Sequence, residues 1–171
     1  MKDKISEKRA WLLSLGLRVI FGLVWLIDGA LKFQPGIPSV FPSLIQNVSI
    51  GQPAWLMPWF NYWHGVVGAN PVFWVYLIGT GEILLALGLI FGFMKKITYS
   101  AGIMLSLLIW AVPEGFGGPY GPSSTDIGTG IIYALLFVAL IVINKVEHPN
   151  RYSFDYFIGK KIRWWHRIAE F

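Results

Sequence analysis

Four apolar segments limit what this chain can fold into more than any other feature. They cover approximately residues 10–31, 72–92, 97–112 and 127–143. A helix of about 20 apolar residues crosses the hydrocarbon core of a bilayer, so the first two segments are long enough alone and the last two need their polar flanks. The composition agrees, because 55% of the residues are hydrophobic and 13% are charged, against about 45–50% and about 25% in soluble domains. The sequence predicts an all-α integral membrane protein with a four-helix transmembrane bundle.

The distribution of positive charge predicts the orientation of this bundle. Lysines and arginines precede the first segment, separate the second from the third and follow the fourth, whereas residues 33–71 and 113–126 contain none. Cytoplasmic loops carry an excess of Lys and Arg, so we expect four spans of the cell membrane with both termini cytoplasmic. The formal charge of +5 then reflects topology and not nucleic-acid binding, because the cations flank apolar runs and form no single stripe. Residues 1–144 form the bundle in this prediction, and residues 145–171 form a basic amphipathic cytoplasmic tail.

Aromatic residues predict an interfacial helix in the first uncharged loop. Trp55, Trp59 and Trp63 recur at every fourth residue, which places them on one face of a short helix at the outer membrane surface. This helix is either an aromatic belt or a hydrophobic cover over a lipid-soluble substrate.

The tail predicts a second amphipathic helix, capped by Ser153, whose basic residues meet anionic lipid headgroups. Its apolar side consists of Phe154, Phe157, Ile158, Ile162 and Trp165.

Ionisable residues inside the spans are costly, so they are candidate functional residues. Arg18 and Lys32 share one helical face of the first span with Gly22 and Gly29, two small residues that let another backbone approach. Asp28 is spaced four residues from Lys32 for an ion pair. Counted from the cytoplasmic ends, Arg18 and Glu82 lie at depths of about 12 and about 15 Å and can meet. Such a pair either locks the first two spans together or handles protons beside a quinone or another apolar ligand.

The loop between the third and fourth spans, PEGFGGPYGPSSTDIGTG (113–130), offers a second candidate site. Ser124, Thr125 or Asp126 can cap the fourth helix, and its free amides together with Lys32 can bind a small anion. Glu114 adds negative charge there, so an anion requires that one carboxylate be paired or protonated. The alternative is a purely structural loop.

The fourth span carries its own polar face. Asp126, Thr129 and Tyr133 continue along one side of that helix. This stripe offers hydrogen bonds to a quinone carbonyl.

The residues that the sequence lacks narrow the possible redox chemistry. There is no cysteine, which excludes disulfides, zinc thiolates and cysteine-ligated iron–sulfur clusters within this chain. His64, His148 and His166 all lie outside the spans, so no histidine pair in the bundle can hold a haem. Any electron chemistry needs another carrier.

Three stretches resemble the DoxX-like membrane proteins. They read RVIFGLVWLIDGALKF (18–33), GTGEILLALGLIFGF (79–93) and WAVPEGFGGPYGPSSTDIGTGIIYALLF (110–137). The last resembles the DoxD-type subunit of thiosulfate:quinone oxidoreductase most, and the resemblance covers approximately residues 10–144. It implies a four-helix bundle that oxidises thiosulfate to tetrathionate outside the membrane and passes electrons to quinone, with a second, smaller partner subunit.

Two functional hypotheses follow. In the first, the chain is a quinone-linked redox subunit that oxidises a small inorganic sulfur anion such as thiosulfate, with membrane lipids, quinone and other subunits as its partners. In the second, it is a non-catalytic structural or accessory subunit of a larger respiratory membrane complex; a transporter comes third. For the first hypothesis, the candidate catalytic residues are Glu82, Arg18 and Asp126, and the candidate substrate-binding residues are Lys32, Asp28, Glu114, Thr125 and Tyr133.

Overall fold

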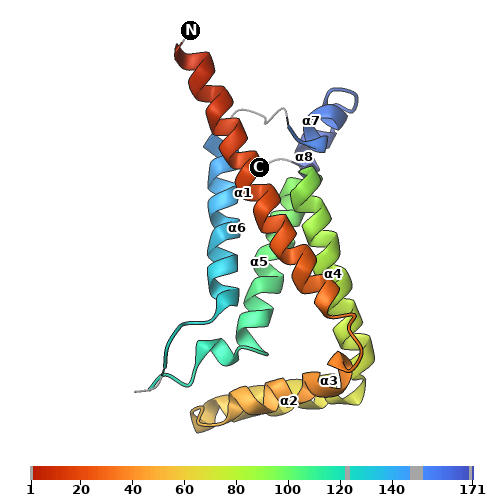
Figure 1. The fold of residues 1–171 in the computed structure, drawn as a ribbon, viewed down its shortest axis with the longest axis vertical. Coiled ribbons are helices and arrows are strands. Elements are labelled where there is room, and N and C mark those ends of the chain that lie inside the picture. The colour runs from red at the N-terminus through yellow and green to blue at the C-terminus, as the bar shows by residue number, and fades with distance from the viewer. Residues whose placement is uncertain (1, 122–123, 147–151, 170) are drawn as a thin grey trace.

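The computed structural model describes residues 2–121, 124–146, 152–169 and 171 (Figure 1). Helices are the only regular elements in these ranges, so the all-α prediction is confirmed there. In chain order they are α1 (Lys2–Leu31), α2 (Ile37–Ser49), the 3-10 turn η1 (Ala54–Leu56), α3 (Met57–Ala69), α4 (Pro71–Phe91), α5 (Lys95–Ala111), the 3-10 turn η2 (Gly115–Gly117), α6 (Thr129–Val146), α7 (Phe154–Gly159) and α8 (Trp165–Ala169).

The four apolar segments correspond to α1, α4, α5 and α6. Within them, Trp11–Leu31 and Pro71–Phe91 are long and apolar enough to cross a membrane, and Thr129–Lys145 is a shorter apolar helix. Two such helices suggest membrane association.

The long helices pack as two pairs, α1 with α4 and α5 with α6. Glycines permit the first pairing: a Cβ atom added to Gly29 would lie 2.9 Å from the carbonyl oxygen of Gly79, so the backbones are nearly in contact. In the second pair, Gly102 lies against the ring of Phe137, and a Cβ atom on Gly130 would meet the carbonyl oxygen of Ser106 at 2.7 Å. The small-residue face predicted for the first span is therefore an interhelical contact.

The two pairs meet at one end and diverge toward the other (Figure 1). Helices α7 and α8 lie at the first end, which we call the tail end, and α2 and α3 cross the second, which we call the hairpin end. A buried cluster that includes Trp25, Leu89 and Phe137 joins the long helices, and another that includes Ile45, Phe60 and Val75 fixes α2 and α3 on α4.

The hairpin end contains more helix than the sequence predicts. The expected single interfacial helix is in fact α2, η1 and α3, with Trp55 in η1 and both Trp59 and Trp63 in α3. The sequence does not predict α2 because proline disfavours the interior of a helix. Pro38 lies in the first turn of α2 and Pro42 lies inside it. The turn that follows Gly36 and the burial of Ile45 hold this helix in place nevertheless.

The tail forms two short helices where a single amphipathic one is expected. Ser153 caps α7 as predicted, its side chain accepting a hydrogen bond from the Tyr156 amide at 3.3 Å. Asp155 explains the break, because its buried carboxylate accepts hydrogen bonds from the Lys95 amide at 3.0 Å and from the Trp165 indole at 3.0 Å. The tail therefore folds back onto the start of α5.

Candidate functional site: an apolar cavity with an ion pair in its wall

A cavity of about 540 Å³ occupies the space between α4 and α5 at the hairpin end. Its wall is largely apolar, with side chains from α2, α3, α4 and α5. Three charged residues interrupt this wall: Lys32, Glu82 and Glu114. The cavity therefore combines the environment of a lipid-soluble ligand with a few groups that bind polar atoms.

The ion pair in the wall joins Lys32 to Glu82. Lys32 Nζ lies 3.2 Å from Glu82 Oε2, and it also donates to the Asp28 carbonyl oxygen at 3.4 Å. Glu82 is 1% exposed, whereas about a quarter of the Lys32 side chain, 24%, remains accessible. The predicted pairing of Lys32 with the Asp28 carboxylate is replaced by this one, because the tight α1–α4 packing brings the Lys32 side chain over Gly79.

The predicted pairing of Arg18 with Glu82 is wrong. Arg18 lies beside Gly92, where α4 ends, and its Nη2 donates to the Tyr152 carbonyl oxygen at 2.7 Å. Because α1 begins at Lys2 and not near residue 10, Arg18 is level with the end of α4. Glu82 precedes Gly92 by ten residues, which corresponds to about 15 Å along the helix axis. Arg18 thus belongs to the tail end.

Glu114 caps α6 from the neighbouring turn. Its carboxylate accepts hydrogen bonds from the Gly130 amide at 2.8 Å and from the Thr129 hydroxyl. Sequence reasoning gives the cap to Ser124, Thr125 or Asp126, but the Asp126 carboxylate bonds the Gly128 amide at 2.8 Å, before α6 begins. Glu114 therefore takes the amide that the predicted anion site requires.

Trp63 adds a further polar group to the cavity. The sequence identifies it only as part of the tryptophan repeat and assigns it no ligand contact. Its indole nitrogen is buried and has no hydrogen-bond partner among the described residues, and its ring lines the cavity. Buried donors without a partner are rare, so this N–H is a candidate contact for a ligand oxygen. The cover interpretation of the tryptophan repeat fits Trp63 better than the belt interpretation.

The cavity opens sideways between α4 and α5. Leu77 and Leu108 line it and are nevertheless 50% and 38% exposed, so they form its rim. Gly81 lines it as well, and a Cβ atom added there would meet no atom within 4 Å. A ligand can therefore enter from the side of the bundle.

The other predicted site residues lie elsewhere. Tyr133 packs its ring on Phe21 and Trp25, at centroid distances of 5.4 and 5.6 Å. Thr125 and Asp126 are exposed loop residues. The structure thus brings Lys32, Glu82 and Glu114 into one cavity, with Asp28 adjacent, and does not form the predicted polar stripe on α6.

Comparisons of the chain with protein-family models, with curated proteins and with solved structures find no match. The DoxX-like resemblance stays a prediction from the sequence.

Proposed function

We propose that this chain crosses the membrane four times, through α1, α4, α5 and α6, and binds a quinone in the cavity as a quinone-linked redox subunit. Both termini are cytoplasmic in this proposal, and the hairpin end faces outward. The observation that carries it is an apolar cavity, open sideways between two helices, with the Lys32–Glu82 ion pair in its wall.

Apolar side chains on the outside of all four long helices support the membrane topology. Each of these helices has large hydrophobic side chains that are more than half exposed. This exposure is unfavourable in water but not in lipid. Examples are Ile20 and Ile27 on α1, Leu84 on α4, Met104 on α5, and Leu135 and Val142 on α6. Four spans account for these faces better than two.

The chemistry of the wall fits a quinone. A quinone is a flat apolar ring with carbonyl oxygens that accept hydrogen bonds, and its reduction consumes two electrons and two protons. The Lys32 ammonium and the Trp63 indole are donors, and the Glu82 and Glu114 carboxylates can exchange protons with the cavity. The cavity volume lies within the range of about 300–1,000 Å³ for small-molecule sites.

The electron donor in this proposal follows from the DoxX-like resemblance. Two thiosulfate ions joined to tetrathionate release two electrons, which matches the demand of one quinone. Glu114 occupies the Gly130 amide at the start of α6, and its negative charge opposes an anion there. We therefore place the donor outside the α6 terminus and expect the partner subunit to contribute to its binding.

A plug in the cavity tests the quinone site. Gly81→Leu adds a side chain where open space exists, so we expect the affinity for decyl-quinone to fall at least about tenfold, which corresponds to about 1.4 kcal/mol. Gly65→Leu on α3 is the matched control, because a Cβ atom there also meets no atom within 4 Å and Gly65 does not line the cavity. Binding is measured by titration of the purified chain in lipid nanodiscs. Equal affinity in both variants would place the quinone elsewhere.

The second candidate function is a non-catalytic accessory subunit of a larger respiratory complex. The observation that favours it is the tail, where Phe157 and Trp164 are 58% and 59% exposed although Asp155 bonds the segment to the start of α5. Such a rigid aromatic surface fits a neighbouring subunit. Thiosulfate-dependent reduction of quinone by the purified chain with its co-purifying partners would exclude this alternative, whereas isolation in a stable complex without turnover would support it.

A further inference from the structure

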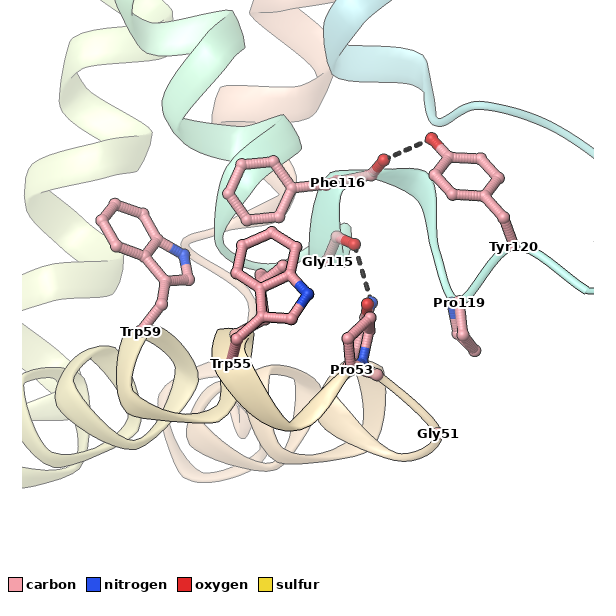
Figure 2. A pocket seen from close by; sticks show the side chains of 10 residues that line it. Gly51, Pro53, Trp55, Trp59, Gly115, Phe116, Pro119 and Tyr120 are labelled. Carbon is pink, nitrogen blue, oxygen red and sulfur yellow. Dashed lines mark hydrogen bonds between the residues drawn. The ribbon is translucent and has the colours of Figure 1, made fainter.

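The hairpin end carries a second concavity, separate from the cavity just described. It is a groove of about 620 Å³ between the α2–α3 connection and the turn η2 (Figure 2). Four aromatic rings contribute to its lining: Trp55, Trp59, Phe116 and Tyr120. Trp55 is 78% exposed and Tyr120 is 63% exposed, so their ring faces are available to a ligand.

Gln52, Trp59 and Tyr120 direct their side-chain hydrogen-bond donors to partners within the protein. Gln52 Nε2 donates to the Gly115 carbonyl oxygen at 2.8 Å, and the Tyr120 hydroxyl donates to the Phe116 carbonyl oxygen at 2.6 Å (Figure 2). The Trp59 indole donates to the Ala111 carbonyl oxygen at 2.9 Å. The groove therefore offers mainly ring faces, which favours recognition through the π-systems over hydrogen bonding.

Phe116 is held in this wall against its backbone preference. Its φ of 59° and ψ of 21° lie in the left-handed region that a bulky residue rarely adopts. The turn around it is closed by the Gly117 amide, which donates to the Glu114 carbonyl oxygen at 2.8 Å. The ring packs between Trp110 and Trp59 at centroid distances of 5.3 and 6.0 Å. Strained residues of this kind cluster at binding sites, which is an independent sign of function here.

Charge selects the ligand class. Residues 33–71 and 113–126 supply every side chain of the groove and contain no Lys or Arg; Glu114 and Asp126 belong to the same segments but do not line the groove. The segment after Asp126 lies close by, since a Cβ atom on Gly117 would collide with the Ile127 backbone. Aromatic faces carry negative potential, so a groove lined by them and by no cation attracts a positive charge, and the carboxylates outside its lining add to this attraction at longer range.

We infer that the groove binds a quaternary ammonium group. A trimethylammonium ion makes no hydrogen bonds and is stabilised by the negative faces of aromatic rings, so it fits a wall of ring faces in which Gln52, Trp59 and Tyr120 already use their donors within the protein. The group comes either from a free cation such as choline or from the headgroup of a choline lipid. Because a phosphate would lack a cationic partner in this groove, we expect the free cation to bind more tightly than phosphocholine.

A charge comparison at constant shape tests this inference. The full chain in phosphatidylglycerol nanodiscs is titrated calorimetrically with choline and with 3,3-dimethylbutan-1-ol, its neutral isostere. We expect choline to bind at least about tenfold more tightly than the alcohol. Equal binding of the two, or no binding of choline, would overturn the inference.

Three variants locate the binding site, and a change of nanodisc lipid identifies the source of the ligand. Trp55→Ala should reduce choline affinity at least about fivefold, whereas Trp164→Ala, which changes another exposed tryptophan, at the tail end, should not alter it. Tyr120→Phe retains the ring, so binding should persist. Loss of binding only in Tyr120→Phe would assign the site to hydrogen bonding and contradict a cation–π site.

Weaker choline binding in phosphatidylcholine nanodiscs would identify the lipid headgroup as a competing occupant, and unchanged binding would identify the free cation as the ligand.

Discussion

The two ends of the bundle bury charged residues in opposite ways. At the tail end, Arg18 and Asp155 are 2% and 0% exposed, and both bond segments distant in sequence. At the hairpin end, the equally buried Glu82 pairs with Lys32 on the wall of a cavity. Charge that the chain surrounds with its own donors and acceptors fixes the fold, whereas charge beside open space is available to a ligand.

The comparison explains why residue type alone did not identify the site. Arg18 and Glu82 are both ionisable residues inside apolar helices, so both qualify as candidates by cost. Arg18 is a structural group, because it holds the backbone of the tail at Tyr152 and interacts electrostatically with Tyr99 and Asp155. The Lys32–Glu82 pair, in contrast, lines a space that a ligand can fill.

Removal of the tail-end carboxylate should cause the largest loss of stability. Asp155→Ala leaves the amides of Met94 and Lys95 and the indole of Trp165 without their acceptor. We expect a loss of about 3–5 kcal/mol, as for other broken buried charge networks. Thermal unfolding in detergent measures it. The control is Asp126→Ala in an exposed loop, with an expected change of about 1 kcal/mol or less, and similar losses in both variants would contradict the structural role of Asp155.

The ion pair at the hairpin end should show strong coupling. Lys32→Met leaves the Glu82 carboxylate buried without its cation, and we expect a loss of about 2–4 kcal/mol, reduced by the partial exposure of Lys32. Lys32→Met combined with Glu82→Leu removes both charges and should recover stability to within about 1 kcal/mol of the parent. Unfolding of all variants in the same detergent gives the cycle. Additive losses would show that the two residues do not act as a pair.

Two glycines of the α1–α4 region should respond differently to the same substitution. Gly29→Ala places a methyl group 2.9 Å from the Gly79 carbonyl oxygen, so we expect a loss of about 1–3 kcal/mol as the helices separate. Gly81→Ala meets open space and gains helix propensity, so it should be neutral or stabilising by up to about 1 kcal/mol. Thermal unfolding distinguishes them, and a destabilised Gly81→Ala would argue that the cavity is filled by protein.

The sequence predicts much of the fold because hydrophobic length and glycine spacing are local properties. The four long helices and the packing face that contains Gly22 and Gly29 follow from them. The partner of Glu82 does not, because it depends on where α1 begins relative to α4. Arg18 lies beside Gly92, about ten residues or about 15 Å from the level of Glu82, and Lys32 is the cation that reaches this carboxylate.

Other parts of the site depend on contacts between distant segments. Glu114 caps α6 only because η2 turns it toward Thr129, and the left-handed backbone of Phe116 within η2 has no signature in its residue type. The tail shows the same limit, since Asp155 appears in the sequence as an ordinary residue of an amphipathic helix. Local pattern identifies candidate residues, and tertiary contacts decide which of them share a cavity.

The smallest predicted effect concerns the unpaired donor in the cavity wall. Trp63→Phe retains an aromatic ring and removes an indole N–H that has no partner among the described residues, so the fold should lose little or no stability. If a quinone oxygen accepts from this N–H, its affinity should fall about threefold to tenfold, as for one lost hydrogen bond. Trp74→Phe is the matched control, because Trp74 lines the same cavity and loses the same atoms; its affinity change should stay within about twofold. Titration of decyl-quinone into both variants measures the difference. Equal losses would attribute the effect to ring size, and the Trp63 N–H would then have no part in binding.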